Sequence, residues 1–181
     1  MRRVVVTGMG IVSSIGNNTQ EVTASLRAGR SGITRADRLA ELGFRSQVHG
    51  APTLRAEEII DRRAMRFHGG GTAWNHVAMD QAIVDSGLAP DEVSNQRTGI
   101  IMGSGGPSTR AIVEAADTAR TKGPKRVGPF AVPKSMSSTA SQTRSRTSIS
   151  APRMGQRVWG LSFGRYRRPQ RSRESKDLPN P

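Results

Sequence analysis

The chain has 181 residues, a formal net charge of +14 and no cysteine. The absence of cysteine excludes disulfides, thiolate metal sites and cysteine nucleophiles. No apolar run approaches the roughly 18 residues that a membrane span needs, and the short apolar start does not suit a signal peptide. We therefore expect a soluble, cytoplasmic protein.

The first elements are predicted from a β-branched run and from helix caps. Residues 3–7, Arg-Val-Val-Val-Thr, form a β-branched run around three valines, which predicts a buried strand that ends at the Gly-Met-Gly turn of residues 8–10. Asn18 is a candidate helix N-cap, with Glu21 as its reciprocal partner. Gly29 is the expected stop of that helix.

The later elements follow from helical periodicity. Apolar residues recur at helical spacing in three segments, and the longest of these is apolar on most sides, which predicts burial on more than one side. The expected elements are a helical segment at 57–67, a helix at 73–86 capped by Thr72, a strand at 99–103, a helix at 110–120 and a helix beginning at Met136 after Ser135, with loops at 32–52 and 123–133.

This order of elements predicts an α/β fold. A strand, helices, a second strand and a helix suit a mostly parallel sheet, since parallel strands need long crossovers. Only two strands are predicted before Gln142, which are too few for a sheet with covered faces. Residues 143–181 show neither period and contain nine arginines. We therefore predict a partial domain at 1–141 and a disordered, arginine-rich tail at 142–181.

Two glycine-rich turns approach phosphate-binding motifs without completing them. The turn at 8–10 nearly matches the dinucleotide fingerprint, but Ser13 stands at its third glycine and the next helix is expected only after Asn18. The turn at 103–106 lacks the Lys-Ser/Thr pair of a P-loop. We interpret both as structural turns and predict no cofactor.

The histidines of the chain are His49, His68 and His76. His68 and His76 are eight residues apart, whereas helical metal ligands lie one turn apart. No cysteine or acidic cluster accompanies them. We predict solvated or packed histidines and no metal site.

Basic side chains gather at two places. Arg62, Arg63 and Arg66 form a small face at helical spacing, which suits either a solvated surface or a docking site for an acidic partner. The tail adds arginines near Trp159 and Tyr166, a composition that superficially suits nucleic acid. No recognised nucleic-acid-binding fold accompanies the tail, so we do not expect nucleic acid as a partner.

Five stretches, taken in order, carry a family resemblance. They are Arg-Arg-Val-Val-Val-Thr-Gly-Met-Gly-Ile-Val-Ser-Ser-Ile-Gly-Asn-Asn (2–18), Leu-Arg-Ala-Gly-Arg-Ser-Gly-Ile (26–33), Ile-Asp-Arg-Arg-Ala-Met-Arg-Phe (60–67), Gly-Ile-Ile-Met-Gly-Ser-Gly-Gly (99–106) and Val-Gly-Pro-Phe-Ala-Val-Pro-Lys-Ser-Met (127–136). Together they resemble the β-ketoacyl-acyl-carrier-protein synthases, the condensing enzymes of bacterial fatty-acid synthesis, over residues 1–141.

The resemblance implies an incomplete thiolase-like fold, the first part of the N-terminal α/β repeat of a homodimeric acyltransferase. Family members condense acyl and malonyl thioesters through a cysteine at a helix N-terminus, with two histidines and a lysine of the second half. This chain departs from the family after Ser141 and never reaches that cysteine. We expect an inactive, aggregation-prone chain with unpaired strand edges, and we hypothesise a frameshift near codon 141.

The resemblance also implies a partner, the acyl carrier protein. Segment 61–67 matches the family segment whose basic residues help to dock the carrier. This predicts docking through Arg62, Arg63 and Arg66, and Lys125 and Arg126 are further candidates. The alternative is a non-catalytic binding module, either for acyl carrier protein or, through the tail, for nucleic acid.

Overall fold

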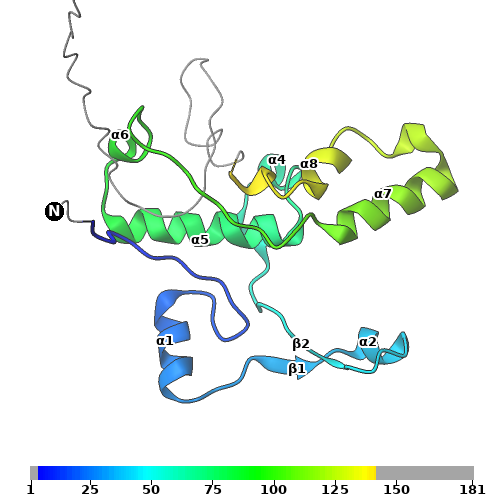
Figure 1. Cartoon of the computed structure of the whole chain (residues 1–181), viewed down its shortest axis with the longest axis horizontal. Coiled ribbons are helices and arrows are strands. Elements are labelled where there is room, and N and C mark those ends of the chain that lie inside the picture. Colours follow the sequence, from blue (N-terminus) through cyan, green and yellow to red (C-terminus); the bar gives the residue numbers. More distant parts are fainter. Residues whose placement is uncertain (1–3, 142–181) are drawn as a thin grey trace, which may run out of the picture.

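The computed structural model describes residues 4–141, so the predicted tail at 142–181 lies outside the described residues. Figure 1 shows α5 as the long central helix, with α1 and a two-stranded ribbon below it and α4 and α8 above it. The elements are α1 (Thr19–Arg27), β1 (Ile33–Arg35), α2 (Asp37–Glu41), β2 (Val48–Gly50), α3 (Ala56–Ile59), α4 (Arg62–Met65), α5 (Gly70–Ser86), α6 (Pro90–Val93), α7 (Thr109–Lys122), η1 (Pro124–Arg126) and α8 (Ala131–Ser135).

The two predicted strands are wrong within the described residues. Residues 4–7 belong to no strand, and Val4, Val5 and Val6 are 74%, 67% and 75% exposed. Residues 99–103 form no strand either. A β-branched run sets a preference for extended backbone, whereas a strand also requires the hydrogen bonds of a neighbouring strand. Residues 4–141 supply no such neighbour to either segment.

The sheet in residues 4–141 lies where the sequence predicted a loop with short pieces of structure. β1 and β2 pair antiparallel, with Ile33 opposite Gly50 and Arg35 opposite Val48. All residues of both strands are exposed, so the pair is a surface ribbon. The predicted parallel sheet is therefore wrong for this part of the chain.

The Gly-Met-Gly turn lies against α5 at very short range. A Cβ added at Gly8 would overlap the carbonyl oxygen of Ala82, and one added at Gly10 would overlap the carbonyl oxygen of Ala78. The Gly10 Cβ would also lie 2.8 Å from the amide nitrogen of Ala82. Both glycines are therefore required because two backbones touch here.

Side chains of α5 bind the backbone of the same N-terminal segment. The carboxylate of Asp85 accepts the N–H of Met9 at 2.8 Å, and the side-chain oxygen of Gln81 accepts the N–H of Ile11 at 3.1 Å. The amide nitrogen of Gln81 also donates to the carbonyl oxygen of Asn17 at 2.7 Å. α5 thus satisfies backbone groups that a neighbouring strand would satisfy in a sheet.

The first helix is capped as the sequence predicted. Asn18 Oδ1 accepts the N–H of Glu21 at 2.9 Å. The Glu21 carboxylate reaches back to the N–H of Asn17 at 2.8 Å, one residue before the position of a standard capping box. Gly29, at φ +61°, follows the end of α1, which confirms the predicted stop.

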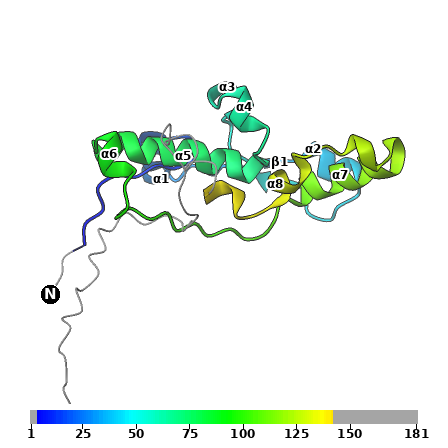
Figure 2. The same cartoon turned by 90° about the horizontal axis from the view of Figure 1, so that it is seen from above.

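The helical segment predicted at 57–67 is two short helices, α3 and α4. Ile60 lies between them with extended backbone, and its side chain is only 6% exposed. It packs with Ala56, Ala73 and Val77 in the buried cluster that joins α3 to α5. Figure 2 shows α3 and α4 together on one side of α5. This break in the helix allows Ile60 to enter the core while α4 stays at the surface.

The predicted bounds of the later helices shift. α5 begins at Gly70, after Gly69 as its N-cap, and so earlier than the predicted start at Ala73. Ser108 caps α7 as its side-chain oxygen accepts a backbone N–H. Ser135 ends α8, and helical backbone resumes only at residues 139–141, three residues after the predicted start at Met136. Within residues 4–141, no helix is long and apolar enough to cross a membrane.

Gly71 offers a test of the α5 boundary. It lies exposed in the first turn of the helix, and a Cβ there would meet nothing within 4 Å. We expect Gly71→Ala to raise the free energy of unfolding by about 0.5–1 kcal/mol, because alanine loses less backbone entropy on folding. Gly87 follows the same helix at φ +62°, so Gly87→Ala should lower it by about 1–2 kcal/mol. Urea denaturation measures both, and a stabilising Gly87→Ala would contradict the left-handed cap.

Candidate functional site: a basic surface on α4 and η1

α4 is a single turn that begins at a side-chain cap. The carboxylate of Asp61 accepts the N–H of Arg63 at 2.8 Å and the N–H of Ala64 at 3.3 Å. These bonds satisfy the first donors of the helix and turn the chain sharply after the buried Ile60. The sequence therefore places Arg62 and Arg63 at the solvent side of the turn.

The three arginines of this segment are exposed and have no acidic partner among residues 4–141. Arg62, Arg63 and Arg66 are all solvent-exposed. The ion pairs within residues 4–141 use other cations. The three positive charges are therefore not neutralised by this part of the fold.

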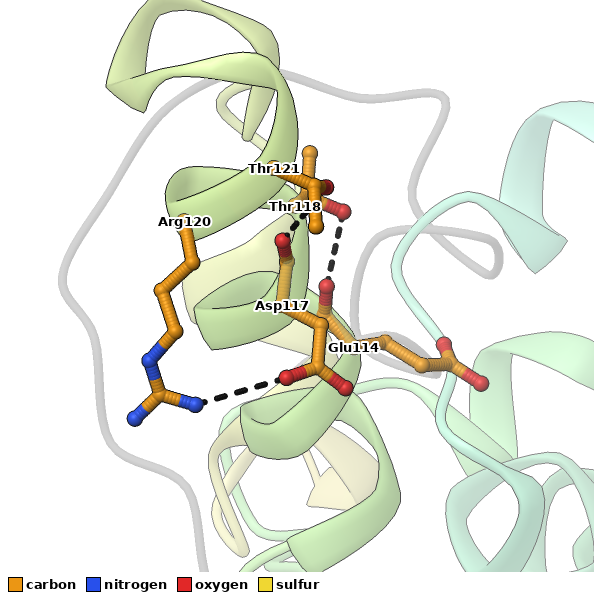
Figure 3. A network of polar contacts seen from close by, with 5 residues as sticks. All are labelled: Glu114, Asp117, Thr118, Arg120 and Thr121. Atoms are coloured by element: carbon orange, nitrogen blue, oxygen red, sulfur yellow. Dashed lines mark hydrogen bonds and ion pairs between the residues drawn. The ribbon is translucent and has the colours of Figure 1, made fainter.

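The arginines of α7 show the contrasting arrangement. Arg120 lies 3.4 Å from the carboxylate of Asp117, and the hydroxyls of Thr118 and Thr121 donate to the carbonyl oxygens of Glu114 and Asp117 (Figure 3). Polar groups on this face of α7 thus interact within one helix, in pairs that are each worth a few tenths of a kcal/mol at a surface. The arginines at α4 make no such pair, and the same is true of other exposed cations in residues 4–141, among them Arg27, Arg45 and Arg97.

Lys125 and Arg126 lie in η1, one residue after the end of α7, and both are exposed. They too have no ion pair within residues 4–141. The loop that follows them returns to α4, where the rings of Phe130 and Phe67 meet edge to face with centres 5.2 Å apart. The guanidinium carbon of Arg66 lies 6.0 Å from the centre of the Phe130 ring.

The structure thus divides the five predicted docking residues between two segments, α4 and η1, that one aromatic contact connects. Phe67 and Phe130 were not among the site residues predicted from the sequence. The two rings are far apart along the chain, so no local period connects them. Both do lie in stretches that carry the family resemblance, at 60–67 and 127–136, and that is the one signal that marks them.

His68 and His76 form a buried pair beside α4. Their ring centres lie 5.1 Å apart, and they are 4% and 9% exposed. Burial, and then the neighbouring His76, lower the pKa of His68 to about 4. His76 Nε2 also lies 3.4 Å from the carboxylate of Asp80. These two histidines are packed and His49 is exposed, as predicted, and no group of potential metal ligands occurs within the described residues.

Comparison with protein families matches residues 1–155 to the β-ketoacyl synthase N-terminal domain. The chain is 47% identical over 142 residues to 3-oxoacyl-[acyl-carrier-protein] synthase 1 of Haemophilus influenzae and 50% identical over 143 residues to that of Escherichia coli K12. Each alignment covers 78% of this chain and 35% of the relative. The chain therefore spans about a third of the length of the curated relatives it matches.

Solved structures agree with the fold. The ishigamide ketosynthase/chain length factor matches 81% of this chain with a TM-score of 0.71 and 28% identity, and a β-ketoacyl synthase from Burkholderia phymatum matches 82% with 0.68 and 27%. The chain covers 37% of each. The incomplete thiolase-like α/β fold is confirmed, although the predicted strand positions are wrong. The chain belongs to the β-ketoacyl synthase family.

Proposed function

We propose that this chain is the N-terminal part of a 3-oxoacyl-[acyl-carrier-protein] synthase, and that its described residues dock the acyl carrier protein. The single observation that carries this proposal is the set of exposed guanidinium groups on α4, at Arg62, Arg63 and Arg66, which no carboxylate within residues 4–141 neutralises. Exposed charges of one sign attract an acidic partner and raise its rate of encounter.

Lys125 and Arg126 provide a second contact in this proposal. They lie in a separate exposed turn, and the loop after them is tied to α4 by the contact between Phe67 and Phe130. A carrier protein that reaches both segments meets five positive charges. Two points of attachment also fix its orientation, which a single charged turn would not do.

We place the acyl-transfer chemistry outside these 181 residues. A chain without cysteine forms no acyl-cysteine intermediate. We also propose that the domain ends near residue 141 and that the arginine-rich tail is a separate segment. A homodimer, a cytoplasmic location and nucleic-acid binding by the tail stay predictions.

The test is a charge reversal with a control of equal charge. We expect Arg63→Glu to weaken the dissociation constant for purified acyl carrier protein about tenfold at low ionic strength, because it replaces an attraction by a repulsion. Isothermal titration calorimetry measures the constant. The difference should shrink at about 0.5 M salt, where charges farther apart than a few ångströms are screened.

Arg120→Glu is the matched control, because it makes the same change in net charge on α7, where Arg120 already contacts Asp117. We expect it to change the dissociation constant less than twofold. Equal losses in the two variants would show that only the overall charge matters, and would overturn the assignment of docking to α4.

A further inference from the structure

The place where α4 meets the loop after η1 is an aromatic contact with a cation beside it. The rings of Phe67 and Phe130 are inclined at 86° with centres 5.2 Å apart, the edge-to-face arrangement that aromatic pairs prefer. The guanidinium carbon of Arg66 lies 6.0 Å from the centre of the Phe130 ring, at the outer limit of a cation–π contact. Phe130 thus contacts Phe67, just after the end of α4, and lies beside the guanidinium group of Arg66.

Phe130 is the N-cap of α8, and backbone contacts hold that helix in place. The carbonyl oxygen of Phe130 accepts the N–H of Lys134 at 3.1 Å at the start of α8, and the N–H of Ser108 donates to the carbonyl oxygen of Ser135 at 2.9 Å. A Cβ added at Gly69 would lie 2.9 Å from the carbonyl oxygen of Lys134. Therefore α8, which begins directly after Phe130, is in close contact with the start of α7 and with the junction of α4 and α5.

The contact with the Phe130 ring is the one that concerns the guanidinium group of Arg66. The side chain is exposed, and it has no carboxylate partner in residues 4–141. An unpaired arginine at a surface samples many rotamers and loses this freedom when it binds a partner. The Phe130 ring beside the guanidinium group restricts that freedom before binding, and a ring face does not use the N–H groups that an acidic partner would accept.

We infer that Phe130 is a positioning residue for carrier docking, which holds the Arg66 guanidinium and ties the turn of Lys125 and Arg126 to α4. This inference rests on the proposed function, because it concerns the orientation of the same docking arginine. Phe130 itself need not touch the carrier protein, and it takes no part in chemistry.

The test distinguishes the contribution of the aromatic ring of Phe130 from that of its apolar volume. We expect Phe130→Leu to weaken the dissociation constant for purified acyl carrier protein about two- to fivefold, since leucine fills the space without a π face. Phe130→Tyr keeps the ring and should bind as the original chain does. Phe44→Leu, at a phenylalanine that is 55% exposed elsewhere on the molecule, should have no effect.

A double-mutant cycle distinguishes an effect that acts through Arg66 from a general loss of packing. In the Arg66→Ala background, Phe130→Leu should weaken binding less than 1.5-fold, roughly, because its effect acts through Arg66. An equal loss in both backgrounds would show a packing role and overturn the inference. So would a Phe130→Leu chain that binds normally while Arg66→Ala binds weakly, and this result would leave the proposed function intact. If Arg66→Ala and Arg63→Glu both bind normally, the proposed function fails, and the inference fails with it.

Discussion

Gly10→Ala should lower the free energy of unfolding by about 3 kcal/mol or more, the largest effect expected of an added methyl group at any glycine of residues 4–141. The added carbon would overlap the carbonyl oxygen of Ala78, and it would lie 2.8 Å from the amide nitrogen of Ala82. Both atoms belong to the backbone of α5, so no side-chain rotation relieves the clash. Relief requires that the N-terminal segment leave the helix. Urea denaturation followed by circular dichroism gives the change in stability.

The control is Gly105→Ala, where an added Cβ meets nothing within 4 Å. That variant should match the original chain within about 0.5 kcal/mol. Hydrogen exchange adds a local readout for Gly10→Ala, because the N–H groups of Met9 and Ile11 are held by side chains of α5 and should exchange faster when the segment detaches. An unchanged midpoint with unchanged exchange at these two groups would contradict the close packing.

Acidification should lower the free energy of unfolding through His68, which is the second large effect. The pKa of this buried histidine is lowered to about 4, whereas an unfolded histidine titrates near 6.5. The unfolded chain therefore binds a proton between these pH values and the folded chain does not. The contribution of His68 is complete above about pH 6.5 and is lost as the pH falls toward 4. At pH 5 the loss amounts to about 2 kcal/mol relative to pH 8.

Variants isolate this contribution from the titration of carboxylates. His68→Met removes the titrating group in a buried position, so its stability should depend less steeply on pH between 4 and 6.5 than that of the original chain. His49→Gln, at the exposed histidine, should leave the pH profile unchanged. Thermal melts at half-unit steps of pH measure all three chains. Parallel profiles for His68→Met and the original chain would show that His68 is not the group responsible.

Local patterns predicted the elements that local contacts build. The cap of α1 depends on Asn18 and Glu21, which lie within one turn of each other, and the prediction is confirmed. Gly29 ends its helix as predicted, since a positive φ is a property of a single residue. The break at Ile60 was missed because only the buried cluster across α5 explains why that residue leaves the helix.

Contacts between distant segments could not be predicted from the spacing of residues along the sequence. The strand predicted at 3–7 needed a neighbour that residues 4–141 do not supply, and the segment lies along a helix instead. The spacing of eight residues suggested that His68 and His76 do not share one face of a helix. Their rings meet nevertheless, because His68 precedes α5 and does not follow its period. For the site, the helical spacing of Arg62, Arg63 and Arg66 predicted a basic face. The choice of acyl carrier protein as its partner came from the family resemblance. The role of Phe130 required the fold.

The rise along the backbone of the N-terminal segment also nearly matches the rise along α5. Two residues of extended chain advance about 6.6 Å and four residues of helix advance about 6 Å. Gly8 and Gly10, two residues apart, accordingly meet the carbonyl oxygens of Ala82 and Ala78, which are four residues apart. The bonds from Met9 and Ile11 follow the same relation, because their acceptors on α5 are also four residues apart.

Such matched repeats would allow the segment to slip by two residues and meet the helix again. The residues flanking the two glycines prevent this, because a slip in either direction brings Val6 or Val12 to a place where even a methyl group has no room. The glycine pair therefore fixes the register of the segment on α5, because only one alignment places a glycine at both close contacts. A folding chain gains the full set of contacts with α5 in that alignment alone, and the shifted pairings are too unstable to trap it.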